Sequence, residues 1–272
     1  MKKTKATAAG GGARALVTGA SSGIGAAFAR QLAARGDALV LVARREDRLR
    51  ALAAELGGDD RAQVVALDLA QPDAGGRLED ELRKRGITID LLVNNAGVGH
   101  TGRFVEGPLE RALAMIDLNA RATVELTRRF LAPMVERGRG AVVNVVSTSA
   151  FQPVPYLAVY AASKAFLLAF TEGIADELRG TGVRVQALCP GLTESEFHQV
   201  SGTDQVRFTR TPTMSAADVA RTSLDALERG TLRVVPGLAN RVVAATQSWL
   251  PRALVRKVAG ELFRPPADPH RD

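Results

Sequence analysis

The feature that most constrains the fold of this chain is a repeated alternation of short apolar runs with longer helical patterns. Continuous apolar strands that alternate with helices are typical of a parallel sheet covered on both faces. We therefore expect an α/β fold with a doubly wound, seven-stranded parallel sheet. Strands are expected at 14–18, 38–43, 63–67, 89–93, 141–146, 183–188 and 232–235. Helices are expected at 24–35, 48–56, 78–85, 160–178 and 216–228, with two helical stretches between 109 and about 135.

The same pattern indicates a single domain over residues 13–237, because no linker interrupts it. A chain of 272 residues fits one large domain. Residues 1–12 are small, basic and rich in glycine, so we expect a disordered N-terminal tail there. Residues 238–272 continue past the last expected strand and are predicted to form a C-terminal helical extension.

Bulk composition narrows the class of protein. Hydrophobic residues make up 46% and charged residues 24%, which is ordinary for a soluble globular protein. The single cysteine, Cys189, excludes an internal disulfide and is expected to be a buried thiol. No apolar run approaches the roughly 20 residues that span a bilayer. The charged N-terminus lacks the apolar stretch of a secretory signal. These features favour a cytoplasmic protein.

Charge and histidine usage argue against two other classes of site. The net charge is +7, but the basic residues are spread out and no nucleic-acid-binding motif accompanies them. Aromatic residues, at 4%, are too few for a base-stacking platform. We therefore expect no nucleic-acid partner. No metal site is expected either, because the three histidines and the cysteine lack ligand spacing; the histidines are His100, His198 and His270.

A glycine-rich turn follows the first expected strand, at residues 18–25. Gly19 would permit a tight turn, Gly23 would let the backbone approach a pyrophosphate, and Gly25 would let the helix pack closely on the sheet. The amides and positive dipole at the start of that helix favour phosphate. The spacing Gly-x-x-x-Gly-x-Gly between a strand and a helix predicts a dinucleotide site.

The end of the second expected strand favours one nucleotide over the other. NAD sites usually place Asp or Glu there to bind the ribose 2′-hydroxyl, whereas this chain has Arg44 and Arg45. A guanidinium attracts a 2′-phosphate and can bind it in bidentate fashion. We therefore expect NADP(H), with NAD(H) as the weaker alternative. Arg48 and Arg50 are interpreted as ordinary residues of a helix surface.

A proton-transfer group is predicted further along the chain. Tyr160 and Lys164 are four residues apart and share one helix face, and Ser147 lies thirteen residues before the tyrosine. A nearby ammonium favours the phenolate and lowers the pKa of a phenol from its usual value of about 10. A serine hydroxyl can donate to a substrate oxygen. The chain uses arginine far more than lysine, so a lysine here suggests a task for a compact ammonium.

These motifs together resemble the short-chain dehydrogenase/reductase family over residues 14–197. The resemblance implies a Rossmann-type fold and a catalytic set of Asn119, Ser147, Tyr160 and Lys164. It also implies a substrate loop at 192–214 and substrate contacts from Ser147, Tyr160, Tyr156 and Phe197. The cofactor-binding positions that it implies are Gly19, Ser21, Ser22, Gly23, Ile24, Gly25, Arg44, Arg45, Asp68, Leu69, Asn95, Ala96, Gly97, Tyr160, Lys164, Pro190, Gly191 and Thr193.

The resemblance also implies a reaction. Hydride from NADPH would reach a carbonyl carbon, Tyr160 would protonate the oxygen, and Ser147 would position it. Lys164 would hold the nicotinamide ribose, and Asn119 would keep a water that connects Lys164 to solvent. Family members are commonly dimers or tetramers, so we expect a homodimer or homotetramer. In the substrate loop, His198 is interpreted as a solvated helix residue.

The C-terminal extension suggests a further contact. Leu254, Val255, Val258 and Leu262 would form one helical stripe, with basic residues largely outside it. The stripe fits packing against the domain or a second subunit, or peripheral contact with acidic lipid. An apolar carbonyl or alcohol substrate, such as a 3-oxoacyl, steroid-like or other ketone, is expected. The alternative functions are a nucleotide-binding sensor and a membrane-docking protein on the same fold.

Overall fold

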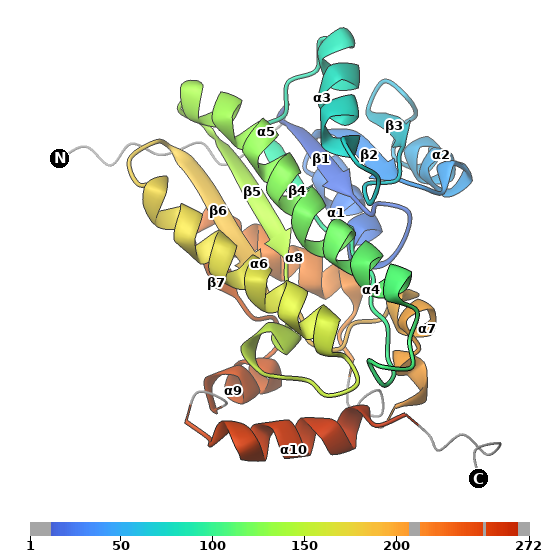
Figure 1. Ribbon diagram of the computed structural model, residues 1–272. Helices are drawn as coiled ribbons and strands as arrows, with labels where there is room; N and C mark the ends of the chain where they lie inside the picture. The colour runs from blue at the N-terminus through green and yellow to red at the C-terminus, as the bar shows by residue number, and fades with distance from the viewer. Residues whose placement is uncertain (1–11, 207–212, 247–248, 266–272) are drawn as a thin grey trace.

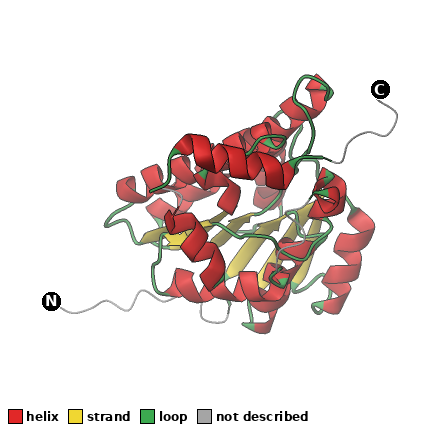
Figure 2. Ribbon diagram, turned by 90° about the horizontal axis from the view of Figure 1, so that it is seen from below, coloured by secondary structure: helices red, strands yellow, loops and turns green. Residues whose placement is uncertain are grey.

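The computed structural model of the chain describes residues 12–206, 213–246 and 249–265. It shows a seven-stranded, wholly parallel sheet in the order β3-β2-β1-β4-β5-β6-β7 (Figures 1 and 2). The doubly wound α/β prediction is therefore confirmed. The strands are β1 (Arg14–Thr18), β2 (Ala38–Ala43), β3 (Ala62–Ala66), β4 (Leu91–Asn94), β5 (Gly140–Val145), β6 (Val183–Leu188) and β7 (Arg233–Val234).

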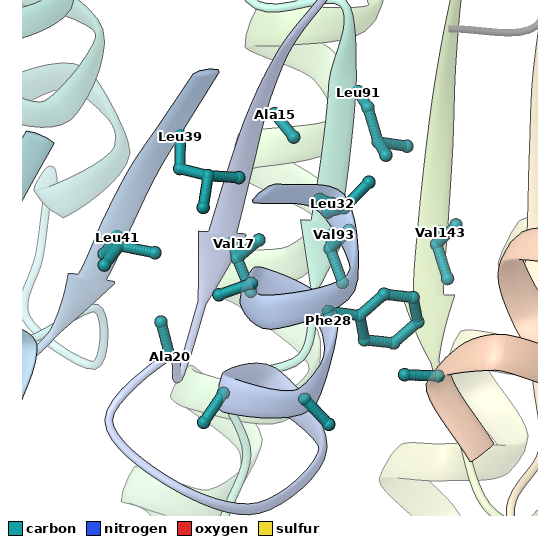
Figure 3. Close-up of a cluster of buried hydrophobic side chains, with 14 of the residues drawn as sticks. Ala15, Val17, Ala20, Phe28, Leu32, Leu39, Leu41, Leu91, Val93 and Val143 are labelled. Atoms are coloured by element: carbon teal, nitrogen blue, oxygen red, sulfur yellow. The ribbon is translucent and has the colours of Figure 1, made fainter. Parts of the chain in front are cut away.

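One face of the sheet is covered by α1 (Gly23–Ala34), α2 (Glu46–Glu55) and α8 (Ala216–Glu228). Figure 3 shows Phe28 and Leu32 of α1 above apolar side chains of the central strands. Both are buried, and each such side chain contributes about 1.5–3 kcal/mol of transfer free energy. This packing fixes the first helix directly behind the turn that leaves β1.

The other face is covered by α3 (Ala74–Lys84), α5 (Ala122–Glu136) and α6 (Ala158–Glu177). The sequence predicted that α3 begins at residue 78, but it begins four residues earlier and includes Gly75 and Gly76. A Cβ on Gly75 would lie 2.6 Å from Oε1 of Glu125 on α5. Close packing on α5 thus outweighs the low helix propensity of glycine.

Helix α6 has the length and composition that a membrane span would need, with a mean hydropathy of 1.2 over its most apolar window. It lies against the sheet and buries Tyr160, Lys164, Leu167 and other side chains there. The opposite face is less covered, because Phe166 is about half exposed there. The helix therefore packs one face against the core of the domain.

Shorter elements gather beyond the carboxyl ends of the strands. They are α4 (Leu109–Ile116), a π-helical turn η1 (Asp117–Arg121), and the 3₁₀ turns η2 (Thr148–Phe151) and η3 (Thr203–Gln205). With them lie α7 (Phe197–Ser201), α9 (Leu238–Thr246) and α10 (Arg252–Phe263). Part of the expected substrate loop, residues 207–212, and nearly all of the expected N-terminal tail fall outside the described residues.

The C-terminal extension forms α9 and α10, which lie together at one end of the molecule (Figure 1). Of the stripe predicted for α10, only Val255 is buried. Val255, Ala259 and Phe263 are buried, whereas Leu254 and Val258 are about half exposed. Phe263 joins an apolar cluster with Leu157 and Tyr160. Helix α10 therefore packs against the domain with the adjacent face.

Candidate active site

A cavity of about 310 Å³ lies at the carboxyl ends of the strands. The strand order reverses between β1 and β4, and open α/β sheets bind ligands at such a switch point. The turn after β1 lines one part of the groove, and Tyr160 and Lys164 line another. Of the eighteen predicted cofactor-binding positions, seventeen line this groove. Besides Tyr160 and Lys164 they are Gly19, Ser21, Ser22, Gly23, Ile24, Arg44, Arg45, Asp68, Leu69, Asn95, Ala96, Gly97, Pro190, Gly191 and Thr193.

 Gly25, the remaining predicted cofactor-binding residue, is buried in α1 and does not line the groove.

The glycine turn shows why these positions exclude larger residues. Gly19 and Gly23 have left-handed φ angles of 63° and 54°, which glycine adopts without strain. A Cβ on Gly25 would collide with the carbonyl oxygen of Gly19 and lie 2.5 Å from Nδ2 of Asn95. The close approach at Gly25 is therefore to the turn and Asn95, where the sequence suggested packing on the sheet.

Asn95 braces this turn from the end of β4. Its Nδ2 donates to the carbonyl oxygens of Thr18, at 2.9 Å, and Gly19, at 3.3 Å. The Thr18 hydroxyl accepts from the backbone amides of Asn95, at 2.9 Å, and Ala96, at 3.0 Å. The two strand ends are thereby tied together, so the amides of the turn face a preformed groove.

The end of β2 places two arginines differently. Arg44 is exposed at the groove wall, whereas Arg45 reaches over the glycine turn and donates to the hydroxyls of Ser21, at 3.1 Å, and Ser22, at 3.0 Å. Asp68 also lines this end of the groove, and its Oδ1 accepts from the amide of Ala70 at 3.1 Å. The positive charge that the sequence predicted at this end is present.

The prediction that Arg48 is an ordinary residue of the helix surface is wrong. Its guanidinium forms an ion pair with Glu196, which comes from the segment before α7. Arg45 pairs with the same carboxylate, with 2.8 Å between Nη1 and Oε2. Arg50 does behave as predicted and pairs with Glu46 within α2. Hydrogen bonds from Arg48, the larger contribution, and from Arg45 lower the pKa of Glu196 to about 2.

Tyr160 and Lys164 lie side by side on α6, as their spacing predicted. The Lys164 Nζ donates to the carbonyl oxygen of Val145 at 2.7 Å and lies 5.8 Å from the centre of the Tyr160 ring. Both residues are buried. Burial lowers the pKa of Lys164 to about 8, because it disfavours the charged ammonium.

The pKa of Tyr160 differs from the sequence-based expectation. Burial raises it to about 12, and a hydrogen bond with Ser147 acts in the opposite direction without overcoming burial. Ser147 caps η2, where its Oγ accepts from the amide of Ser149 at 3.1 Å. The lowering that the sequence predicted from Lys164 is therefore not found, and the phenol is protonated at neutral pH.

Asn119 lies outside the cavity wall, fully buried in the π-helical turn η1. Its Oδ1 accepts from the Val98 amide and its Nδ2 donates to the Val98 carbonyl oxygen, both at 2.9 Å. Nδ2 also donates to Ser163 Oγ at 3.1 Å. Such turns often occur at functional sites. Here the side chain fixes the segment after β4 against α6.

The loop after β6 closes the groove on the remaining side. Thr193 is buried, and its hydroxyl donates to the Gly191 carbonyl oxygen at 3.0 Å. His198 is not a solvated residue as predicted. It is half-buried at the cavity wall, and its ring nitrogens lie 3.0 Å from Thr203 Oγ1 and from the carbonyl oxygen of Thr193. Burial lowers its pKa.

Comparison with known proteins shows the family of the chain. Residues 13–206 match the model of the short chain dehydrogenase family. The chain belongs to the short-chain dehydrogenase family. It is 39% identical to sulfoacetaldehyde reductase 2 of Chromohalobacter salexigens, over 75% of this chain and 84% of that protein. The chain also matches two longer relatives, of which the match covers only 61% and 59% of their own length.

Two solved structures share the fold along nearly the whole chain. One is a short-chain dehydrogenase from Sphingobium yanoikuyae in complex with NADPH, with 33% identity, a TM-score of 0.77, and coverage of 95% of this chain and 100% of that one. The other is from Burkholderia phymatum in complex with NAD, with 25% identity, a TM-score of 0.81, and coverage of 98% and 100%. Relatives thus bind either nucleotide.

Two predicted substrate contacts of this short-chain dehydrogenase have different outcomes. Phe197 lines the groove, with its ring centre 5.4 Å from that of Tyr160. Tyr156 instead lines a separate cavity of about 180 Å³ with Phe104 and Met115. Its backbone is left-handed, with φ of 65°, which is uncommon for a residue other than glycine.

Other residues of this short-chain dehydrogenase escaped the sequence reasoning. Glu196 and Phe263 both line the groove, yet neither belongs to a local motif. Asn240 of α9 would collide with a Cβ on Gly191, so the extension also supports the loop after β6. The apolar periodicity of residues 252–263 was the available signal for Phe263. Among the described residues, no group of three His, Cys, Asp or Glu side chains could hold a metal ion.

Proposed function

We propose that this short-chain dehydrogenase uses NADP(H) to interconvert a carbonyl group and a secondary alcohol. The observation that carries the proposal is the convergence of Ser147, Tyr160 and Lys164 in the groove that the glycine turn and Arg45 also line. The left-handed glycines leave room for a pyrophosphate to approach the backbone. When bound, the nicotinamide supplies hydride to the carbonyl carbon or accepts it from the alcohol.

Tyr160 is proposed as the proton donor for carbonyl reduction. Because burial raises its pKa to about 12, the phenol carries its proton at neutral pH. The Ser147 hydroxyl is proposed to donate to the same substrate oxygen and hold it near Tyr160. Donors fixed in this way stabilise charge that develops on the oxygen in the transition state.

Lys164 and Asn119 are proposed to support that proton transfer. The Lys164 ammonium beside the Tyr160 ring favours negative charge on the phenol oxygen as the proton leaves. It is also proposed to bind the nicotinamide ribose. Asn119 positions the Val98 backbone next to this pair and is proposed to keep the relay water. Gly97 lies between Asn119 and Lys164, since a Cβ on this glycine would be 3.2 Å from Asn119 Oδ1 and 3.5 Å from Lys164 Nζ.

The preference for NADP(H) is proposed from the charge at the end of β2. Arg44 and Arg45 line the groove there, and a 2′-phosphate is attracted by guanidinium groups. Fluorescence titration with NADPH and NADH tests the preference on the wild type, Arg44→Ala and Arg45→Ala. Tighter binding of NADPH that either substitution abolishes would support the proposal. Equal binding of the two nucleotides by the wild type would contradict it.

The substrate is proposed to be apolar, because apolar side chains surround Tyr160. Phe197, Leu157 and Phe263 line this part of the groove. A reductive screen with NADPH should therefore include 3-oxoacyl thioesters, steroid ketones and other bulky ketones. Small charged aldehydes are the matched comparison, and a clear preference for them would refute the apolar assignment.

The proposed assembly and location rest on two sets of exposed apolar side chains. Exposed apolar side chains on α4 and α6, namely Leu113, Ile116 and Phe166, suit a homodimer or homotetramer. The exposed Leu254 and Val258 of α10 lie near basic residues, which suits peripheral contact of a cytoplasmic protein with acidic lipid. Light scattering and vesicle sedimentation test the two proposals separately.

Turnover separates this enzyme from the two alternative functions. A nucleotide-binding sensor would bind NADPH without carbonyl reduction, and a membrane-docking protein would bind vesicles without either activity. The retained Tyr160 and Lys164 favour the enzyme, because neither alternative needs a buried phenol beside a buried amine. Carbonyl-dependent oxidation of NADPH by the wild type is the deciding measurement.

A further inference from the structure

Glu196 joins the nucleotide end of the groove to the substrate loop. It precedes α7, and its carboxylate is held between the guanidinium groups of Arg45 and Arg48. The partners are far apart in the sequence, so the contact is a product of the tertiary fold. These two arginines keep the pKa of Glu196 near 2, so the carboxylate is charged throughout the physiological range.

Two members of this ion-pair cluster, Arg45 and Glu196, line the end of the groove where the nucleotide is proposed to bind. Arg45 also donates to Ser21 and Ser22 in the glycine turn, and Glu196 lines the same cavity as these serines. The neighbouring Ser195 lies over the turn, because a Cβ on Gly23 would be 2.9 Å from the Ser195 Cβ. Arg45 therefore links the Glu196 carboxylate to the hydroxyls of the glycine turn at the wall of the groove.

A carboxylate and a pair of arginines at this place favour different nucleotides. Guanidinium groups attract a 2′-phosphate, whereas a carboxylate repels it and accepts a hydrogen bond from a ribose 2′-hydroxyl. We propose that Glu196 is a cofactor-selectivity residue, whose carboxylate competes with the 2′-phosphate of NADP(H) for Arg45 and Arg48. This rests on the proposed use of NADP(H), and it means that the substrate loop reduces a preference set by the arginines.

The proposal predicts a change in selectivity when the charge of Glu196 is removed. In Glu196→Gln, we expect the ratio of the NADH and NADPH dissociation constants to rise about three- to tenfold, because a repulsive charge beside the 2′-phosphate is lost. Most of the change should be tighter binding of NADPH. Nicotinamide fluorescence titrations of both nucleotides measure the ratio at low and at physiological ionic strength, where screening should reduce the effect.

Glu194→Gln is the matched control. It removes the same charge from the same loop, two residues away, and the described contact of the Glu194 side chain is with the Thr213 hydroxyl. This variant should leave the ratio near the wild-type value. Because Glu196 is partly exposed, both variants are expected to fold, and thermal unfolding verifies this.

Arg48→Ala tests the other partner. It should weaken binding of NADPH more than binding of NADH, whereas Arg50→Ala, which loses only a pair within α2, should change neither. An unchanged or lower ratio in Glu196→Gln would overturn the proposal and would indicate a carboxylate that merely fastens the loop. The wild-type ratio by itself tests the proposed preference for NADP(H). A rise in Glu196→Gln supports the proposal even if the wild type shows no preference for NADPH.

Discussion

At the scale of single residues, burial controls the protonation of the two central side chains. Tyr160 and Lys164 share one face of α6, but each is buried. The low polarity disfavours the charged form of each, so it raises the pKa of the phenol and lowers that of the amine. In the structure the pair therefore consists of a protonated phenol beside an amine whose pKa is about 8.

Removal of the Tyr160 hydroxyl should abolish turnover without loss of the fold. Tyr160→Phe keeps the ring that packs against Phe197 but lacks the proton donor. We expect kcat to fall at least about 10²–10⁴-fold, which is the usual contribution of general acid–base catalysis. Nucleotide binding should persist and serves as the control. Substantial residual turnover would remove Tyr160 from the proposed mechanism.

The pH dependence of reduction should follow Lys164. Its pKa of about 8 means that the ammonium is present below that pH and is lost as the pH rises through it. Tyr160, with a pKa of about 12, remains protonated over the same range. We expect kcat/KM for carbonyl reduction to decline above about pH 8, since this parameter reports groups of the free enzyme. A flat profile up to pH 10 would show that the charge on Lys164 is unimportant.

At the scale of elements, the turn between β1 and α1 depends on close contact with the end of β4. No side chain fits at Gly25, because the Gly19 carbonyl and Asn95 occupy the space that a Cβ would need. The start of α1, the turn before it and the end of β4 are thus one packed unit. A substitution at the start of α1 should consequently alter the shape of the groove.

Gly25→Ala tests this unit. We expect nucleotide affinity to fall at least about tenfold and the free energy of unfolding to fall by about 1–3 kcal/mol, because the extra methyl overpacks the turn. Gly173→Ala is the control in α6, where a Cβ meets nothing within 4 Å. It should be neutral or stabilise by up to about 1 kcal/mol. Similar affinities for the two variants would disprove the packing argument.

At the scale of the whole molecule, the C-terminal extension contributes to the wall of the groove near Tyr160. Phe263 packs in a cluster with Leu157 and Tyr160, although about a hundred residues separate it from them in the sequence. Asn240 meets Gly191 in the loop after β6. The extension is therefore part of the site, in addition to any contact that its exposed face makes.

Phe263→Ala should affect both stability and substrate binding. Loss of a buried ring costs up to about 3–5 kcal/mol, and less if α10 detaches locally. We expect a higher KM for apolar ketones, with a smaller effect on nucleotide binding. Val258→Ala on the exposed side of α10 is the control and should change stability by about 0.5 kcal/mol or less. Equal KM values for the two variants would contradict a role for Phe263 in the site.

The sequence by itself determined the elements that depend on local pattern. Continuous apolar runs identified the parallel strands, and the spacing of Tyr160 and Lys164 placed both on one face of α6. The glycine turn and Arg45 were also found from the sequence, because each follows directly from the end of a strand. Boundaries were less certain, as at α3, where packing of Gly75 on another helix extended the element.

Only the tertiary structure decided the features that join distant parts of the chain. The pair between Glu196 and Arg48 spans 148 residues, and no local periodicity encodes it. The half-buried position of His198 and the raised pKa of Tyr160 likewise depend on which neighbours exclude water. Local pattern specifies helices and strands through short-range geometry, whereas burial and charge pairing arise when those elements pack together.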